Sequence, residues 1–377
     1  MTTPTTPLHY TVYESWLTAG LHGEMAYLET DRARKRRADP RQILPECESI
    51  LVLGIRYPAA MPETPDVIPT PRGRVASYAW GDDYHDLLPA RLQHLIEFIG
   101  TQTGGYPVPN RWYTDTGPIL ERDLAERAGL GWIGKNTCLI HPGQGSYFLL
   151  AEILLGLPLD PDPPFTTDHC GSCTRCLDAC PTQCILPDRT IDATRCISYL
   201  TIELKGSIPI ELRPQTGNWV FGCDVCQEVC PWNIRFAESE SGVGYNSSRV
   251  VPNSIAFTPR ESVPTPDLRA ELHLTPEQFN RKFKDSPIQR PKRRGYLRNV
   301  AVALGNAGNP AALPDLAHAM NDPEPLVRAH AAWALGRIGG ETARQTLLAA
   351  ILTETASEVR AEISRALSHI LQNINSG

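Results

Sequence analysis

Apolar and polar residues along the first 160 positions form stretches that predict both strands and helices. The run ILVLGI at residues 50–55 has the length and the β-branched content of a buried strand, whereas residues 86–99 place apolar side chains at helical spacing. Residues 10–30 also predict a helix. Strand and helix signals alternate as far as Leu159, which predicts an α/β or α+β domain.

The last hundred residues repeat one pattern. Residues 297–305 (LRNVAVALG) align with 327–336 (VRAHAAWALG) and with 359–367 (VRAEISRAL), at offsets of 30 and 32 residues. Small residues recur where two helices would approach, and Asn309-Pro310 and Asp322-Pro323 stand at the expected helix joints. A helix-pair repeat of this length predicts a short HEAT-like solenoid.

Shifts in composition mark the domain boundaries. A proline-rich link over 158–164 closes the first domain, and a cysteine-rich segment follows it. We predict a first domain over 1–165, a cysteine-rich module over 166–235, a loop-rich connection over 236–290 and helical repeats over 291–377. The predicted fold class is therefore multi-domain α+β, and 377 residues suffice for two or three separate cores.

Net charge and hydropathy limit the class of protein and its cellular location. The net charge of -6 argues against a wholly basic nucleic-acid binder and leaves room for a local basic patch. Residues 1–10 lack the pattern of a signal peptide, and the longest apolar stretch, 146–159, contains Glu152 and is too short to span a bilayer. We expect a soluble, cytoplasmic monomer without a membrane partner, in which Cys47 and Cys138 are buried thiols.

The most specific motif is a double cysteine run. The first run ends in Cys-Pro at residue 180, and the second ends in Cys-Pro at residue 230 but has Val220 in place of its first cysteine. In bacterial ferredoxins three cysteines of each run hold one 4Fe-4S cluster, and the fourth, before a proline, ligates the other cluster. A zinc site or disulfides would not explain the Cys-Pro endings. The pattern predicts a ferredoxin-like module with two clusters.

The crossed pattern assigns the ligands. One cluster would bind to Cys170, Cys173, Cys176 and Cys230, and the other to Cys180, Cys223, Cys226 and one further thiol. Cys196, in the run RCISY, is favoured for that last place, and Cys184 remains an alternative. We expect the two clusters to pass electrons singly to another site in the protein, and a reduced ferredoxin- or flavodoxin-type protein to supply them.

A carboxylate upstream of the cysteines is the catalytic candidate. The segment YTDTGPILER puts Asp115 in a turn ahead of a helix, where capping that helix is the alternative role. Residues 129–136 (GLGWIGKN) are glycine-rich and aromatic, as expected where backbone closes over a flat ligand. The sequence has no phosphate loop or dinucleotide fingerprint, which argues against a nucleotide cofactor in a Rossmann turn.

A basic stretch lies between the connection and the repeats. From Arg281 to Arg298 (RKFKDSPIQRPKRRGYLR) eight Lys or Arg residues stand with one acid and with Phe283 and Tyr296. This composition suits phosphate contacts and base stacking, and a solvated connector is the alternative. The basic run at 32–37 (RARKRR) lies on a predicted helix and favours a solvated face.

These segments together resemble the epoxyqueuosine reductase family. The resemblance rests on WGDDYH at 80–85, YTDTGPILER at 113–122, GLGWIGKN at 129–136, CGSCTRCLDACPT at 170–182, RCISYLTIE at 195–203, GCDVCQEVCPWN at 222–233 and the repeats. It implies a cobalamin-binding α/β domain resembling those of reductive dehalogenases, a module with two 4Fe-4S clusters and a tRNA-binding C-terminal region. The implied reaction reduces epoxyqueuosine at the wobble base of tRNA to queuosine.

The resemblance also implies roles for single residues. Converting an epoxide to an alkene consumes two electrons and two protons and releases water, and we expect Asp115 to protonate the departing oxygen with a pKa raised by burial beside the corrin. Further cofactor contacts are expected at Arg56, Tyr57, Tyr84, His85, Arg122, Lys135, Asn136, Ser198 and Asp224. Each of these could instead serve the core or a cap, and His85 is given a polar pocket role rather than that of an axial cobalt ligand.

For tRNA, the resemblance makes the basic stretch the first choice. The predicted contacts are Lys205, Arg281, Lys282, Lys284, Arg290, Lys292, Arg293, Arg294 and Arg298. A nucleotide of the anticodon stem-loop of a queuosine-type tRNA would have to be splayed into the pocket. This chain has no cysteine between Cys47 and Cys138, so a mechanism that needs a pocket thiol is doubtful here.

Two other classes of function remain alternatives. A corrinoid iron-sulfur reductase of a small molecule would share the first two modules but would have no use for the repeats and the basic stretch. A non-catalytic ferredoxin-type electron carrier that docks through the repeats would need neither Asp115 nor a corrin. Binding of tRNA and of cobalamin distinguishes the three.

Overall fold

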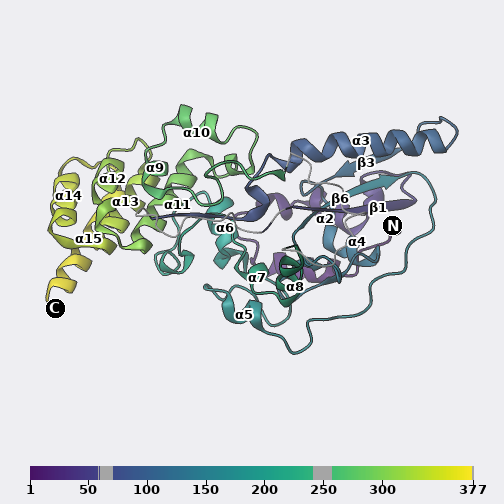
Figure 1. The fold of residues 1–377 in the computed structure, drawn as a ribbon, viewed down its shortest axis with the longest axis horizontal. Helices are drawn as coiled ribbons and strands as arrows, with labels where there is room; N and C mark the ends of the chain where they lie inside the picture. The colour runs from purple at the N-terminus through teal and green to yellow at the C-terminus, as the bar shows by residue number, and fades with distance from the viewer. Residues whose placement is uncertain (58, 60–70, 241–256, 376–377) are drawn as a thin grey trace. The chain divides into compact units, whose positions relative to one another are not determined.

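The computed structural model describes residues 1–57, 59, 71–240 and 257–375 (Figure 1). Apart from the gaps, the chain folds into two compact units that are interleaved in sequence. The first comprises residues 1–60, 81–196 and 224–258, and the second comprises 61–80, 197–223 and 259–377. Part of the predicted connection, 241–256, lies outside the described residues, and the domain boundaries proposed above stay predictions.

A three-stranded antiparallel sheet forms the frame of the first unit. Its strands are β1 (Ser49–Arg56), β6 (Phe148–Leu155) and β3 (Asn110–Tyr113), in the order β1-β6-β3. The predicted strand at 50–55 is thus confirmed as β1. Helix α4 (Glu121–Arg127) packs Leu124 against Val52 and Leu154 of the sheet, which buries one apolar cluster.

The helices of the first unit follow the predicted periodicity in part. They are α1 (Tyr10–Thr18), α2 (Asp31–Ala38), α3 (Tyr84–Gln102), α5 (Arg175–Ala179), α7 (Val225–Glu228) and α8 (Pro231–Glu240). Helix α3 confirms the prediction for 86–99, and the basic run RARKRR lies on α2 as expected. The single helix predicted over 10–30 is wrong, because α1 ends at Thr18 and Gly20 follows in the left-handed region at φ +69.

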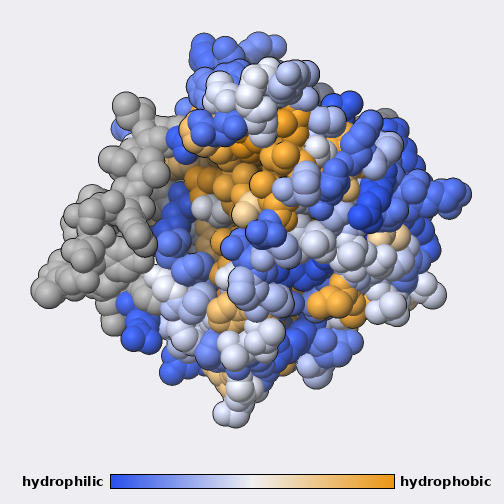
Figure 2. All heavy atoms as spheres, turned by 90° about the vertical axis from the view of Figure 1, so that its right-hand side faces the viewer, coloured by the Kyte–Doolittle hydropathy of each residue, from blue (hydrophilic) through white to orange (hydrophobic). Residues whose placement is uncertain are grey.

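A short hairpin and a polar-rimmed apolar surface complete the description of this unit. The hairpin consists of β4 (Trp132–Ile133) and β5 (Leu139–Ile140). Figure 2 shows one face of the molecule on which hydrophobic residues gather around the middle and hydrophilic residues surround them. Contiguous apolar surface of this kind often marks a ligand or partner site.

None of the described helices combines the length and the apolar character that crossing a bilayer requires.

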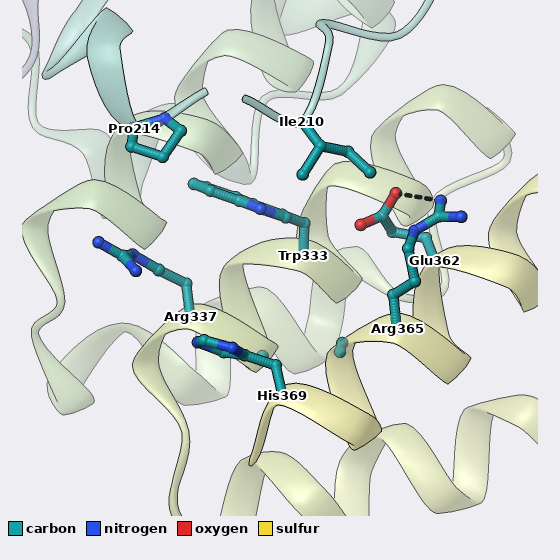
Figure 3. Close-up of a pocket in the computed structure, with 9 residues that line it drawn as sticks. Ile210, Pro214, Trp333, Arg337, Glu362, Arg365 and His369 are labelled. Atoms are coloured by element: carbon teal, nitrogen blue, oxygen red, sulfur yellow. Dashed lines mark hydrogen bonds and ion pairs between the residues drawn. The ribbon is translucent and has the colours of Figure 1, made fainter. Parts of the chain in front are cut away.

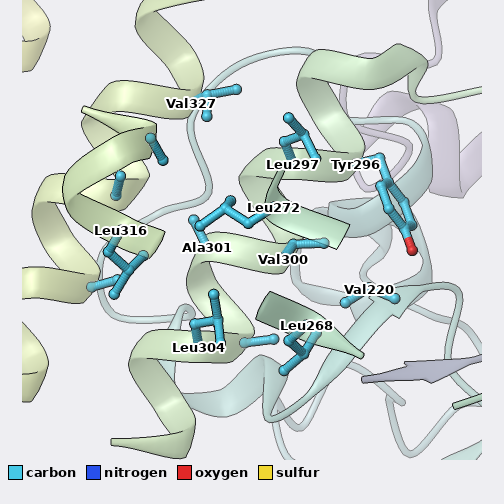
Figure 4. Close-up of a cluster of buried hydrophobic side chains, with 14 of the residues drawn as sticks. Val220, Leu268, Leu272, Tyr296, Leu297, Val300, Ala301, Leu304, Leu316 and Val327 are labelled. Atoms are coloured by element: carbon cyan, nitrogen blue, oxygen red, sulfur yellow. The ribbon is translucent and has the colours of Figure 1, made fainter. Parts of the chain in front are cut away.

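The second unit is mostly helical. Strands β2 (Arg74–Val75) and β7 (Trp219–Phe221) pair in parallel. The helices are α6 (Ile197–Ile202), α9 (Leu268–Leu272), α10 (Pro276–Lys282), α11 (Lys292–Ala307), α12 (Leu313–Ala319), α13 (Pro325–Ile338), α14 (Gly340–Thr353) and α15 (Ser357–Asn375). One hydrophobic core joins them, with Val220, Leu268, Val300, Leu304 and Leu316 among its members (Figure 4).

The predicted repeats are confirmed by helix packing. The three aligned segments lie on α11, α13 and α15, and α13 packs against both of the others (Figure 1). A Cβ atom on Gly305 would lie 2.9 Å from Cα of Ala334, and one on Gly336 would lie 2.8 Å from Cα of Ala366. Small residues therefore stand where the helix backbones approach most closely, as the repeat pattern indicates.

Candidate functional site

Asp115 lies in the loop between β3 and α4. Its backbone adopts the left-handed region at φ 57, and its N–H donates a hydrogen bond of 2.7 Å to Oε1 of Glu121 at the start of α4. The N-cap of α4 is Leu120, five positions further along the chain, so the alternative that Asp115 caps this helix is wrong. A non-glycine residue in this backbone region is uncommon and often marks a functional position.

The start of α3 supplies polar partners to the Asp115 carboxylate. Tyr84 Oη donates a hydrogen bond of 2.9 Å to Asp115 Oδ2, and His85 Nε2 lies 3.6 Å from the same oxygen. On the other side of the imidazole, His85 Nδ1 lies 2.7 Å from Oδ1 of Asp83. Asp83, His85 and Asp115 thus form a row in which the imidazole stands between two carboxylates.

This row holds a proton at neutral pH. Burial by itself would lower the pKa of His85, but hydrogen bonding and charge interactions with Asp115 and Asp83 outweigh it and raise the pKa to about 9. The imidazole stacks on the Tyr84 ring with centroids 4.0 Å apart, which fixes its plane. Sequence reasoning gave His85 only a polar role in the pocket, and the structure makes it a cation beside the catalytic candidate.

The sequence predicts that Asp115 is buried beside the corrin, but the protein alone leaves this side chain largely exposed. Its side chain is 60% exposed. The two nearby acids that sequence reasoning missed, Glu121 and Glu152, are more sheltered: Glu121 is partly buried, and Glu152 is fully buried in the middle of β6. The signal for Glu152 is present in the sequence, as a single acid inside the apolar run FLLAEILL.

Four cysteines that the crossed pattern assigns to one cluster surround a cavity of about 120 Å³ in the first unit. They are Cys170, Cys173, Cys176 and Cys230. The indole of Trp132 donates a hydrogen bond of 3.5 Å to Cys170 Sγ, and Trp232 packs edge-on against Trp132 at 5.0 Å between ring centroids. The tertiary structure therefore brings together thiols that are up to sixty residues apart in sequence, and tryptophan side chains pack beside them.

The glycine-rich segment at 129–136 serves this cavity. Lys135 Nζ donates hydrogen bonds of 2.7 and 3.0 Å to the carbonyl oxygens of Gly171 and Cys173, and Asn136 Nδ2 donates one of 3.3 Å to the carbonyl oxygen of Cys226. A Cβ atom on Gly131 would lie 2.1 Å from the carbonyl oxygen of Ile140, so this glycine allows the hairpin to close. Lys135 and Asn136 thus hold the cysteine loops, and the expectation that this segment closes over a flat ligand stays a prediction.

Three members of the second predicted ligand set, Cys180, Cys196 and Cys226, belong to the first unit, and Cys223 ends a segment of the second unit. The alternative ligand Cys184 is buried, with its Sγ 3.4 Å from that of Cys180 and its thiol within hydrogen-bonding reach of Cys196. None of the eleven cysteines, all of which lie in the part of the chain that the structure describes, forms a disulfide. Cys47 is buried as predicted, whereas Cys138 is only partly buried.

The remaining predicted cofactor contacts are distributed over both units. Tyr57 is buried and packs edge-on against Tyr147, and Arg122 is exposed and donates a hydrogen bond to the carbonyl oxygen of Thr137. Arg56 ends β1, and Asp224 is a buried N-cap of α7 that accepts a hydrogen bond of 3.3 Å from Gln227. Ser198 lies in the first turn of α6, in the second unit.

The basic stretch divides into exposed and structural residues. Exposed side chains are those of Lys205, Arg281, Lys284, Arg290, Lys292 and Arg294. Arg290 lies 2.5 Å from Glu203, Arg293 forms two hydrogen bonds with Asp322, and Lys282 pairs with Glu271. Lys284 also lies 3.9 Å from Asp285, so four of these cations at the surface of the second unit already have acidic partners.

Arg298 corrects the prediction of an RNA contact at that position. Its side chain is fully buried and donates hydrogen bonds of 2.6, 2.8 and 2.6 Å to the carbonyl oxygens of Leu200, Leu204 and Gly206. Phe283 and Tyr296, which the sequence suggested for base stacking, are buried in the core. Part of the basic stretch therefore serves packing, because the buried Arg298 holds α11 to the segment 200–206.

A second cavity, of about 250 Å³, lies within the second unit. Trp333 crosses it, with Ile210 and Pro214 on one side and Arg337 and His369 on the other (Figure 3). Glu362 at its wall pairs with Arg365 and with the buried Arg213, whose Nη1 lies 3.0 Å away. The sequence analysis did not point to this cavity, because its walls come from a loop and two separate repeats.

Three family models match the chain: a 4Fe-4S double cluster binding domain over residues 169–233, "Epoxyqueuosine reductase QueG, DUF1730" over 37–116, and HEAT repeats over 294–368. An epoxyqueuosine reductase from Pseudomonas aeruginosa is 43% identical over 336 residues, which cover 88% of this chain and 88% of that protein. The chain belongs to the epoxyqueuosine reductase family.

Other relatives agree over the same extent. The epoxyqueuosine reductase from Escherichia coli is 38% identical over 86% of this chain and 81% of its own. A crystal structure of epoxyqueuosine reductase with an epoxyqueuosine-modified tRNA-Tyr stem loop matches 98% of this chain and 94% of its own, with a TM-score of 0.86 and 32% identity. A Bacillus subtilis structure, described as having its aspartate-bearing catalytic loop swung out of the active site, matches with a TM-score of 0.84.

The family membership settles the class of the enzyme and its cofactors. The chain is an oxidoreductase, and as a member of the epoxyqueuosine reductase family it uses two 4Fe-4S clusters and cobalamin. The predicted multi-domain α+β organisation, with a two-cluster module and HEAT repeats, is confirmed.

Proposed function

We propose that this chain reduces epoxyqueuosine to queuosine at the wobble position of tRNA, with Asp115 as the group that protonates the departing oxygen. The observation that carries the proposal is the row formed by Asp83, His85 and Asp115, which presents an exposed carboxylate next to a protonated imidazole. The match to a structure with a modified tRNA stem loop supports the choice of substrate.

The chain's residues fit the cofactors of this reaction. Thiolates are the ligands that iron-sulfur clusters take, and four of them surround one cavity here. Among the residues that the structure describes, the buried His85 Nε2 has no acceptor within normal hydrogen-bond distance, since Asp115 Oδ2 lies 3.6 Å away. The start of α3 can therefore meet a polar group of a ligand. We assign the corrin contacts to Arg56, Tyr57, Tyr84, His85 and Arg122, with Ser198 and Asp224 as further candidates. Bound cobalamin supplies low-potential reducing chemistry at cobalt.

The protein's own part in the reaction is to deliver protons. Breaking a C–O bond of the epoxide leaves an alkoxide, a poor leaving group unless it is protonated. Asp115 stands at the exposed end of the row, and His85 behind it holds a proton up to about pH 9. Proton transfer along this pair to the substrate oxygen leaves a neutral imidazole held by Asp83. Tyr84, bonded to the same carboxylate oxygen, fixes its orientation.

We assign the second cluster to Cys180, Cys196, Cys223 and Cys226. The family model spans all four positions and describes a double cluster domain. Cys196 is preferred to Cys184 because Cys184 is almost fully buried behind Cys180, whereas Cys196 is partly exposed. An external one-electron donor of ferredoxin or flavodoxin type would then reduce the clusters in turn.

We assign tRNA contacts to the exposed cations of the second unit, Lys205, Arg281, Lys284, Arg290, Lys292 and Arg294, with the partly buried Lys282 and Arg293 beside them. Lysine and arginine side chains that neutralise phosphates give affinity without reading sequence.

The test is turnover of epoxyqueuosine-containing tRNA by the anaerobically reconstituted enzyme, with mass analysis of the digested RNA for loss of one oxygen. The wild type is expected to convert the tRNA only when cobalamin and a reductant are present. Asp115→Asn is expected to lower kcat by about 10²- to 10⁴-fold, the usual contribution of a general acid. Glu48→Gln, at an exposed acid before β1, is the control. Full turnover by Asp115→Asn would exclude the assigned proton donor.

A further inference from the structure

The fully buried carboxyl group of Glu152 has no counterpart in the chemistry described so far. It lies at the centre of the middle strand β6, where it pairs across the sheet with Val52 of β1 and with Tyr113 of β3. Neither of its carboxylate oxygens has a hydrogen-bond partner among the described residues. An unpartnered carboxyl in such a place is costly to the fold, since a leucine would pack there without any polar group to desolvate.

Glu152 lies on the face of the sheet that α4 covers, among the apolar side chains of the cluster that this helix buries. Strand alternation puts it on the same face of β6 as Leu154, which packs against α4, the helix that Glu121 begins. Glu121 in turn accepts the hydrogen bond from the backbone N–H of Asp115 at 2.7 Å. The three acids therefore form a series from the sheet interior to the exposed loop: Glu152, Glu121 and Asp115.

The charges around this series keep the inner acids protonated. Burial, then the charges of Glu121 and Asp115, raise the pKa of Glu152 well above its usual range. Burial and the Asp115 carboxylate raise the pKa of Glu121 to about 8, against the weaker lowering effects of the hydrogen bond from the Asp115 N–H and of the charges of Arg122 and Arg37. At neutral pH the two inner acids thus hold protons close to Asp115, which must be protonated again after it has given a proton to the substrate.

The stoichiometry of the reaction calls for such a store. Both C–O bonds of the epoxide break, a C=C bond forms, two electrons arrive from the reduced cofactors, and the oxygen leaves as water with two protons. The row ending in Asp115 holds one transferable proton, on His85. We propose that Glu152 and Glu121 hold the second proton of each turnover and pass it to Asp115 while the bound tRNA covers the site. Solvent restores both protons after the product leaves.

This inference rests on the proposed function, and its test separates the two. Conversion of the tRNA by the wild-type holoenzyme is measured first, because absence of conversion would refute the function itself and say nothing about Glu152. Given conversion, Glu152→Gln and Glu121→Gln are expected to lower kcat at least tenfold with unchanged KM for tRNA. Their kcat is expected to fall at lower pH than that of the wild type, and Glu152→Asp is expected to restore part of it.

Two readouts do not depend on turnover. The infrared spectrum of the wild-type protein is expected to show the C=O stretch of protonated carboxyl groups at neutral pH, shifted in D2O and reduced in Glu152→Gln. Glu152→Met, which replaces the unpartnered acid by an apolar side chain of similar length, is expected to raise Tm while it lowers kcat. Glu48→Gln is the matched control and should change none of these quantities.

The infrared, stability and kinetic results can either support or overturn the proton store. A protonated-carboxyl band, a higher Tm for Glu152→Met and a lower kcat for all three neutral variants would support the proton store. Absence of the band in the wild type would overturn it, even if a variant failed to fold. Wild-type kcat and pH profile in a well-folded Glu152→Met would overturn it as well, since they would reduce Glu152 to a structural residue.

Discussion

Lys135 and Gly171 are joined by a hydrogen bond of 2.7 Å from the lysine Nζ to the glycine carbonyl oxygen. The same ammonium group bonds Cys173, so it holds the loop that carries two of the predicted cluster ligands and places a positive charge beside them. Groups in this position tune how tightly a metal centre is held.

Lys135→Met is therefore expected to weaken retention of the first cluster by about 10- to 100-fold, the usual effect of losing a group that supports metal ligands. Iron and sulfide content after mild chelation, together with the EPR signal of the reduced protein, measures this. Lys205→Met, at an exposed lysine of the second unit, is the control. Equal iron retention in Lys135→Met and wild type would contradict the assigned role.

The pH dependence of turnover follows from His85. Its protonated form is needed, and its pKa is raised to about 9, so kcat is expected to stay high through neutral pH and to fall as the pH rises through about 9. The ion pair's contribution to stability has the same sign: it is fully present below the usual histidine pKa of 6.5 and is lost through about pH 9.

His85→Gln is expected to lower kcat by about 10²-fold or more and to remove that alkaline limb. A pH profile of kcat for both proteins is the measurement. His94→Gln, at an exposed histidine on the same helix, should keep the wild-type profile. An unchanged profile in His85→Gln would remove the imidazole from the proton path.

The close helix contacts of the repeats predict a stability effect. Gly336→Val forces at least one side-chain carbon against Ala366, where a Cβ atom would lie 2.6 Å from the Ala366 Cβ. Overpacking of this kind costs about 1–3 kcal/mol of unfolding free energy. Gly206→Ala is the matched control, because nothing lies within 4 Å of its Cβ position. Denaturant unfolding compares the two.

The basic stretch makes opposite predictions for its exposed and its buried members. Arg294→Ala is expected to weaken tRNA binding and to reduce the slope of log K against log salt by about 1, because one phosphate contact is lost. Arg298→Ala is expected to destabilise the protein by several kcal/mol, since each buried carbonyl left without a donor costs about 1–3 kcal/mol. Binding measured at several salt concentrations, and unfolding by denaturant, separate the two effects.

Arg328 and Glu354 give the second unit an acid-sensitive connection. Arg328 donates hydrogen bonds of 2.7 and 2.8 Å to the two Glu354 oxygens, and this pairing lowers the pKa of Glu354 to about 2. The stabilisation is present above the usual glutamate pKa of 4.5 and is lost as the pH falls toward about 2. Arg328→Ala is expected to lower the unfolding free energy by about 1–3 kcal/mol at pH 7. That difference should shrink in acid, as thermal unfolding at several pH values can show.

Some of these features follow from local patterns. The strand at 50–55, the helix at 86–99, the repeats and the cysteine runs depend on spacing along a few residues, and the sequence predicts each of them. The helix over 10–30 failed because periodicity does not show where a glycine turns the chain, as Gly20 does. Arg298 was misassigned because a basic residue looks the same in sequence whether its guanidinium meets phosphate or three backbone carbonyls.

The sequence by itself determined the chemistry that this protein carries: cluster thiols at crossed spacing, a carboxylate in a turn and a helical repeat, each encoded by neighbours in the chain. Tertiary structure alone decided which groups act together. It placed His85 of α3 against Asp115 after β3, and it buried Glu152 of β6 where burial and the charge of Glu121 raise its pKa. A side chain's proton affinity depends on burial and on nearby charge, and both are set by segments far apart in sequence.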